Sequence, residues 1–410
     1  MKNKTVLFIV SGISLVLGIL LRIYFLYKPG YQTDIGSFLQ WGNQIKDGGF
    51  WSLFGGNYYQ TKGIDYPPLI PLITSWWLSF GSVFPKINLV AFFKILPTIF
   101  ELALVVISAL YIIKSKSKYI YILLPLVLIQ PAMALVTSAW GQVDVIMSLF
   151  ILLAFLALDK NKYLTTILLF LAVITKPQAA IAIGIYFLYL LLKEKFLDFI
   201  SQLLFFFLLI AITILIFTDF GNSSFLSVYL NSVGHYTSVS LHAFNIWWLG
   251  FGIKSWNVKD TLGSPITYKM LGFILLILSA IPVVVNIIRS AKKPEDLLLL
   301  TSYSCLAFFL LPTEMHERYL FPTIALMAIP AAKNRGLLIS YILISATFFL
   351  NCYAVLQSTF PQFSIGGGNL LAGGWTKVVA LVNILIIIYL AIYLILAKPK
   401  LNNTKKQESK

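Results

Sequence analysis

The chain has 410 residues, of which 59% are hydrophobic and only 11% are charged, whereas about 25% of the residues are charged in a typical soluble domain. This composition excludes a soluble globular protein. The net charge of +16 does not indicate nucleic-acid binding, because lysine and arginine gather in short loops between apolar stretches, as they do in the cytoplasmic loops of membrane proteins.

Twelve apolar segments predict an all-α, polytopic transmembrane helical bundle in one domain, residues 1–397, followed by a basic cytoplasmic tail, residues 398–410. A helix needs about 20 residues to cross the hydrocarbon core, where it must satisfy its own backbone groups. The predicted helices are 5–27, 88–113, 119–135, 142–158, 162–175, 177–192, 198–218, 267–288, 296–312, 319–333, 336–356 and 376–397. Their lysine-rich loops alternate, which places both termini in the cytoplasm. The first run is too long for a cleaved signal peptide, so we expect it to stay as a helix.

The loops on the extracytoplasmic side are long, at residues 28–87, 219–266 and 357–375. In the first of them, Ser37 to Ile45 has the pattern of an amphipathic helix on the membrane surface. The apolar run from Pro67 to Phe84 is interrupted by prolines, and counting it as a crossing would invert the next loop. We expect it to be re-entrant or interfacial. The aromatic residues of this loop fit either sugar stacking or an interfacial belt: Trp41, Trp51, Tyr58 and Tyr59.

Five polar motifs lie at the predicted outer ends of the helices. They contain Asp34; Asp65 and Tyr66; Gln142 and Asp144; Lys176 and Gln178; and His316, Glu317 and Arg318. A charge at membrane depth costs at least about 2.5–3.5 kcal/mol, so it usually marks a site or a compensating pair. A carboxylate can accept a hydroxyl proton, and cations can stabilise a departing phosphate. Together the motifs suit transfer of a group from a phosphate to an alcohol.

Each motif also has an ordinary structural interpretation. The carboxylates can cap helices or start turns, Lys176 can snorkel to the interface, and the residues from His316 to Arg318 can form a local ion pair. Against that last alternative, neighbouring residues do not face each other on a helix, so Arg318 is expected to be free for a ligand. Three further charged residues lie inside predicted helices, and we expect structural roles for them: Arg22 snorkelling outward, and Lys94 and Glu101 on one helix face.

With these motifs the sequence resembles the GT-C superfamily of glycosyltransferases, and above all the bacterial relatives of the mannosyltransferase that adds the second mannose of the glycosylphosphatidylinositol anchor. The resemblance is carried, in chain order, by Asp34, Asp65-Tyr-Pro-Pro-Leu69, Trp140-Gly-Gln-Val-Asp144, Thr175-Lys-Pro-Gln178, Ala243-Phe-Asn-Ile-Trp247 and Met315-His-Glu-Arg-Tyr-Leu-Phe-Pro322. It implies a long first extracytoplasmic loop, a polyprenyl-phosphate sugar donor, most readily a mannose-like hexose, and inversion at the sugar carbon. Many members carry paired acidic residues in the first loop, whereas here Ile35 follows Asp34.

The resemblance also implies residue roles. Asp34 takes the place of the general base. From the chemistry of the motifs themselves, we expect His316, Arg318 and Lys176 to hold the donor phosphate. The predicted substrate-binding residues are Asp65, Tyr66, Gln142, Asp144, Gln178, Asn245 and Glu317. The family does not fix the acceptor, and we expect a glycan, lipid or protein hydroxyl outside a bacterial plasma membrane.

No cofactor is expected, since the sequence has no metal-ligand spacing. The main alternative function is a polytopic transporter or flippase of lipid-linked sugars, which would place charges near the bilayer midplane and repeat its halves. An O-antigen ligase or polymerase is a second alternative, and a binding or scaffold protein is a third.

Overall fold

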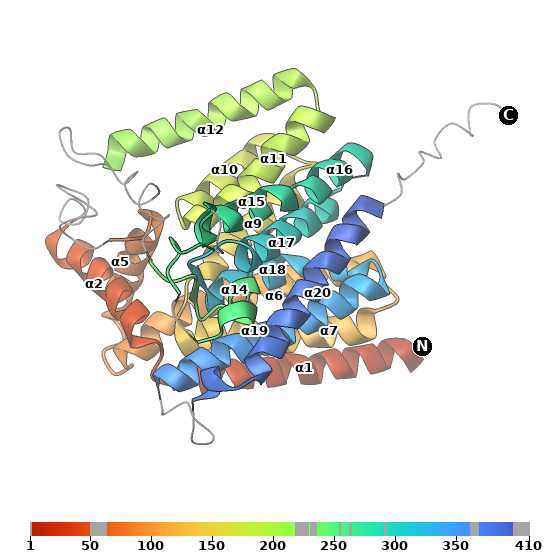
Figure 1. Cartoon of the computed structure of the whole chain (residues 1–410). Helices are drawn as coiled ribbons and strands as arrows, with labels where there is room; N and C mark the ends of the chain where they lie inside the picture. Colours follow the sequence, from red (N-terminus) through yellow and green to blue (C-terminus); the bar gives the residue numbers. More distant parts are fainter. Residues whose placement is uncertain are drawn as a thin grey trace.

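The computed structural model describes residues 2–49, 64–217, 229, 236–253, 256–261, 265–290, 293–360 and 369–396, and the fold in these ranges is mostly helical (Figure 1). In the first half the elements are α1 (Lys2–Leu26), α2 (Gln32–Gly48), α5 (Leu69–Gly81), α6 (Leu89–Ser115), α7 (Ile120–Ile129), α8 (Pro131–Ala134), η1 (Leu135–Trp140), α9 (Asp144–Ala157), α10 (Lys162–Val173), η2 (Pro177–Ala179) and α11 (Ala180–Lys193). The remaining elements are α12 (Phe196–Phe217), β1 (Ser240–Leu241), α14 (Ile246–Phe251), α15 (Tyr268–Ser279), α16 (Ile281–Arg289), α17 (Pro294–Leu310), β2 (Met315–His316), η3 (Glu317–Leu320), α18 (Phe321–Met327), η4 (Pro330–Ala332), α19 (Arg335–Thr359), η6 (Leu370–Ala372) and α20 (Trp375–Leu396).

Several helices are long and apolar enough to cross a membrane, so the chain is an all-α, multi-pass integral membrane protein. Seven such helical segments lie in the described ranges: Lys4–Leu26, Leu89–Ser115, Ile120–Trp140, Phe196–Phe217, Tyr268–Arg289, Arg335–Thr359 and Trp375–Leu396. Each of the twelve predicted segments is helical over most of its length. The others are shorter, so the number of crossings stays a prediction.

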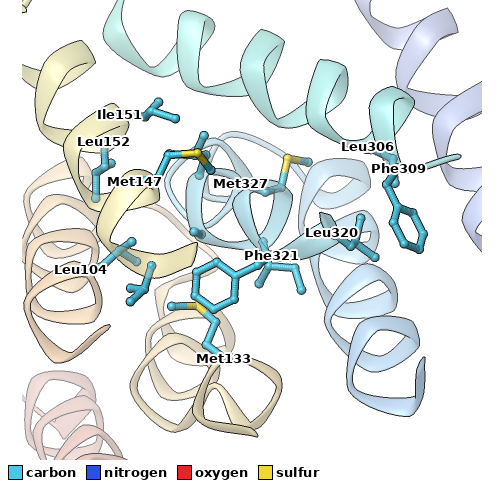
Figure 2. Packing of buried hydrophobic residues seen from close by; sticks show 14 of the residues in the cluster. Leu104, Met133, Met147, Ile151, Leu152, Leu306, Phe309, Leu320, Phe321 and Met327 are labelled. Atoms are coloured by element: carbon cyan, nitrogen blue, oxygen red, sulfur yellow. The ribbon is translucent and has the colours of Figure 1, made fainter. Parts of the chain in front are cut away.

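The core of the bundle is built from the apolar faces of many helices, with α9, α17, α18 and α19 prominent in it. Figure 2 shows side chains from separate elements meeting there, with Phe321 directed toward Met133. By contrast, the outer faces expose apolar side chains, such as Leu204, Phe207 and Leu208 on α12. Because apolar side chains are stable against lipid, this distribution fits a bundle surrounded by a membrane.

In the described part of the predicted first extracytoplasmic loop, two helices pack against each other. The expected amphipathic helix at Ser37 to Ile45 is the longer α2, whose face with Phe38, Trp41 and Ile45 is buried, and its main partner is α5. The apolar run after Pro67 forms α5. Trp51, Tyr58 and Tyr59 lie outside the described residues, as does the tail 398–410.

The start of α1 and the end of α20 lie at one end of the bundle, while α2 and α5 lie toward the opposite end (Figure 1). This arrangement agrees with termini on the same side of a membrane. Which side is the cytoplasm stays a prediction from the positive loops. The two short strands β1 and β2 pair in parallel and join the segment before α14 to the segment before η3.

Candidate functional site

Asp34 lies in the first turn of α2 rather than in the loop after α1. The chain turns at Gly30, whose φ of +78° a residue with a side chain rarely adopts. An acidic residue in the first turn of a helix is favoured by the positive N-terminal end of the helix dipole. Asp34 is therefore neither a loop residue nor the N-cap of α2, which is Tyr31, and helix capping does not account for the contacts of its carboxylate.

The two carboxylate oxygens of Asp34 have different surroundings. Oδ2 accepts a hydrogen bond from Trp140 Nε1 at 2.9 Å and another from the amide Nε2 of Gln142. Oδ1 lies 3.9 Å from Arg318 Nη2, too far for a hydrogen bond, and it accepts none from the rest of the described chain. The Asp34 side chain is 17% exposed, so the carboxylate lies within reach of a ligand.

The turn that contains Trp140 and Gln142 packs closely against the start of α2. It follows the π-helix η1, a rare element often found at functional sites. Trp140 O accepts the backbone N–H of Tyr31 at 3.0 Å, and the two rings stack with centroids 4.7 Å apart. Gly141 has φ +92°, and a Cβ there would meet the Cδ1 of Ile35 at 2.7 Å. The contacts of Tyr31 and Trp140 were missed from the sequence, although the motif around Gly141 pointed to this turn.

Lys176 and Asp144 form a buried ion pair from Nζ to Oδ1, with the two side chains 5% and 3% exposed. Nζ also lies over two aromatic rings, 5.3 Å from the centroid of Tyr66 and 5.5 Å from that of Tyr319. Lys176 therefore does not snorkel to the interface, and that alternative is wrong. Asp144 Oδ2 is buried and has no hydrogen-bond partner among the described residues.

Arg318 does contact its neighbour in the chain. Nη1 donates to Glu317 Oε1 at 3.3 Å, so the expectation that adjacent side chains stay apart is wrong here. The two residues open the short 3-10 turn η3. Arg318 Nε is buried without a partner in the described part of the chain. The N–H group at Nε is thus unsatisfied in the described part of the chain.

His316 begins this turn, and its Nδ1 lies 3.9 Å from Glu317 Oε2. Burial, together with the positive charges of Arg318 and Lys176, holds the pKa of His316 well below its ordinary value. The imidazole is therefore neutral at pH 7 and does not add to the positive charge of the site. A neutral imidazole still offers one donor and one acceptor.

The other predicted residues divide into two groups. Tyr66 packs against Phe38 and Lys176, Asp65 is exposed beside it, and Gln178 has a buried Oε1 with no partner among the described residues. In contrast, the side chain of Asn245 has a structural role. It caps α14 by accepting Trp248 N at 3.1 Å, and it also lies 3.4 Å from the carbonyl oxygen of Phe309.

The three charged residues inside the helices have structural partners, as expected. Arg22 is buried and does not snorkel. Its Nε and Nη2 donate to Glu101 at 3.0 and 2.5 Å, and Thr137 of η1 donates to the same carboxylate at 2.8 Å. Lys94 does not join Glu101. Its ammonium donates to the carbonyl oxygens of Phe25 and Lys28, at the end of α1.

Within the described ranges, no three His, Cys, Asp or Glu side chains are grouped so that they could hold a metal ion. Comparison with protein-family models gives no match, and comparison with curated proteins gives none either. The membership in the GT-C superfamily therefore stays a prediction from the motifs. The geometry adds that residues from five separate motifs contact one another around Asp34, Lys176 and Arg318.

Proposed function

We propose that this protein is a membrane glycosyltransferase of the GT-C type with about twelve crossings. It would move a sugar, most readily a mannose-like hexose, from a polyprenyl-phosphate donor to an extracytoplasmic hydroxyl. One observation carries the proposal. The accessible Oδ1 of Asp34 lies 3.9 Å from Arg318 Nη2, so a proton acceptor and an anion-binding group face the same space.

The reaction that fits this arrangement is a single displacement. The acceptor oxygen forms a bond to the anomeric carbon while its proton passes to Asp34 Oδ1. The bond from the anomeric carbon to the phosphate oxygen breaks, and its electron pair leaves with the polyprenyl phosphate. Arg318 stabilises the charge that develops there. Because attack and departure occur on opposite faces of the sugar, the configuration inverts.

The Lys176–Asp144 pair forms the side of the same site. The ammonium of Lys176 is already neutralised by Asp144, so its effect on a phosphate would be weaker than that of Arg318. Asp144 Oδ2 needs a donor because it is buried and unpartnered in the described chain, and a buried unsatisfied acceptor is costly. A sugar hydroxyl would supply that donor. Lys176 and Asp144 would thus contact the sugar more than the phosphate.

The test uses purified protein reconstituted in lipid and offered a panel of polyprenyl-phosphate sugars with hydroxyl acceptors. Wild type should transfer sugar from at least one donor. Asp34→Asn should lose at least about 100-fold in rate, since a general base contributes about 10²–10⁴-fold. Asp47→Asn is the matched control, because it removes an exposed carboxylate from the same helix. Full activity of Asp34→Asn would contradict the proposal, and movement of the donor across the bilayer without transfer would favour a flippase.

A further inference from the structure

The side chains of Trp140 and Gln142 both point at one oxygen of Asp34. We propose that they are positioning residues, which hold Oδ2 and thereby assign proton transfer to Oδ1. This inference rests on the proposed function, because it concerns how Asp34 acts as a base. It also changes the predicted role of Gln142 from binding the substrate to orienting the carboxylate.

The amide of Gln142 is occupied at both ends. Its Nε2 donates to Asp34 Oδ2, and its Oε1 accepts the backbone N–H of Val143 at 3.3 Å. The side chain is fully buried. Because the amide is buried and is already bonded at both ends, Gln142 is better suited to support Asp34 than to bind a sugar.

The indole of Trp140 is equally constrained. It is buried, it stacks on Tyr31, and its Nε1 donates to Asp34 at 2.9 Å. Tyr31 is the residue just before α2, and its backbone N–H binds Trp140 O. The same turn therefore fixes both the start of the helix and the carboxylate on it. A carboxylate with two donors on one oxygen cannot rotate freely, and such preorganisation favours the reactive geometry.

The kinetic test compares Trp140→Phe, Gln142→Met and wild type. Phenylalanine keeps a ring for stacking but has no N–H, and methionine keeps the length of glutamine without its donor. Each should lower kcat about ten- to a hundredfold, the effect of one hydrogen bond to a charged group, with both KM values within about twofold of wild type. The control is Trp248→Phe, which changes a buried tryptophan whose Nε1 has no partner in the described chain.

A second measurement does not depend on turnover. The indole N–H signals of the nine tryptophans are recorded by ¹H–¹⁵N NMR in nanodiscs, and the signal lost in Trp140→Phe identifies Trp140. This signal should shift in Asp34→Asn and stay in place in Asp198→Asn, a change on the separate helix α12. An unmoved Trp140 signal in Asp34→Asn would overturn the inference.

The two proposals fail in different ways. If Asp34→Asn stops transfer while Trp140→Phe and Gln142→Met keep the wild-type kcat, the inference is wrong and the proposed function stands. A raised KM with kcat retained in Gln142→Met would show substrate binding and also overturn it. If wild type transfers no sugar, the proposed function fails, and the NMR signal alone decides whether Trp140 holds Asp34.

Discussion

Replacing Arg318 by alanine is the sharpest test of how the proposed donor is held. Nη1 binds Glu317, Nη2 lies 3.9 Å from Asp34, and Nε has no partner among the described residues. The edge formed by Nε and Nη2 can therefore grip a phosphate with two parallel hydrogen bonds. We expect Arg318→Ala to weaken use of the donor far more than use of the acceptor.

The magnitude follows from these contacts. Hydrogen bonds to charged groups contribute roughly 1.5–3 kcal/mol each. Because the Arg318 side chain is 13% exposed, screening by solvent lowers this contribution. A loss of about 2–4 kcal/mol raises the KM of the donor about 30- to 700-fold, at 1.4 kcal/mol for each factor of ten. Arg318→Lys keeps the charge but loses the planar fork, so its effect should lie between those of wild type and alanine.

The Arg318→Ala variant also leaves Glu317, which is 2% exposed, without its cationic partner. An unpaired buried charge destabilises the fold. A double variant separates the two effects. Adding Glu317→Gln to Arg318→Ala removes the unpaired charge, so thermal stability should recover while the donor KM stays high. Glu317→Gln alone should change the donor KM little.

The assay measures initial rates against donor concentration at fixed acceptor, and then the converse, with thermal unfolding of each variant recorded in parallel. If Arg318→Ala raises the acceptor KM and spares that of the donor, Arg318 does not hold the phosphate. If the double variant restores the donor KM, the arginine acts by bracing Glu317, and the reasoning is refuted.

Three other predictions concern the fold. Arg22→Leu or Glu101→Leu alone should lower the free energy of unfolding by about 3–5 kcal/mol, whereas the double variant should return to within about 1 kcal/mol of wild type; equal losses in single and double variants would contradict this. Lys94→Met keeps the stem but removes the ammonium that binds the end of α1, and it should cost about 1–3 kcal/mol, measured by thermal unfolding in micelles. A cysteine at Ser82 should react with an impermeant maleimide added to intact cells, while one at Lys116 should not; reversed labelling would place the site in the cytoplasm.

Much of the fold follows from hydropathy, since long apolar runs must become helices in lipid. The least predictable part is the segment from residue 120 to Trp140. Hydropathy predicted one helix ending at 135, but the structure has a break at Gln130 and a π-helix from Leu135 to Trp140. Hydropathy reports which residues are apolar and not which backbone groups are bonded. The position of Trp140 over α2 could therefore not be read from the sequence.

The candidate site, too, could be predicted only in part from the sequence. The motifs named the charged residues, because a charge in an apolar chain is conspicuous. They did not name the partners, which lie far apart in the chain, such as Arg22 and Glu101 or Asp144 and Lys176. The rule for neighbours on a helix did not predict the hydrogen bond from Arg318 to Glu317.

The buried cations of this bundle differ in whether their N–H groups have hydrogen-bond partners within the protein. Arg22 donates to Glu101 and to backbone carbonyls, Lys94 donates to the end of α1, and Lys176 pairs with Asp144. Each of these three cations is bonded to oxygen atoms of the protein, so each can be explained by stability alone. Arg318 keeps an unpartnered Nε in the described chain beside the open oxygen of Asp34. Because a buried donor without a partner is costly, an anionic ligand at Arg318 would remove this cost, and this is why we place the donor phosphate there.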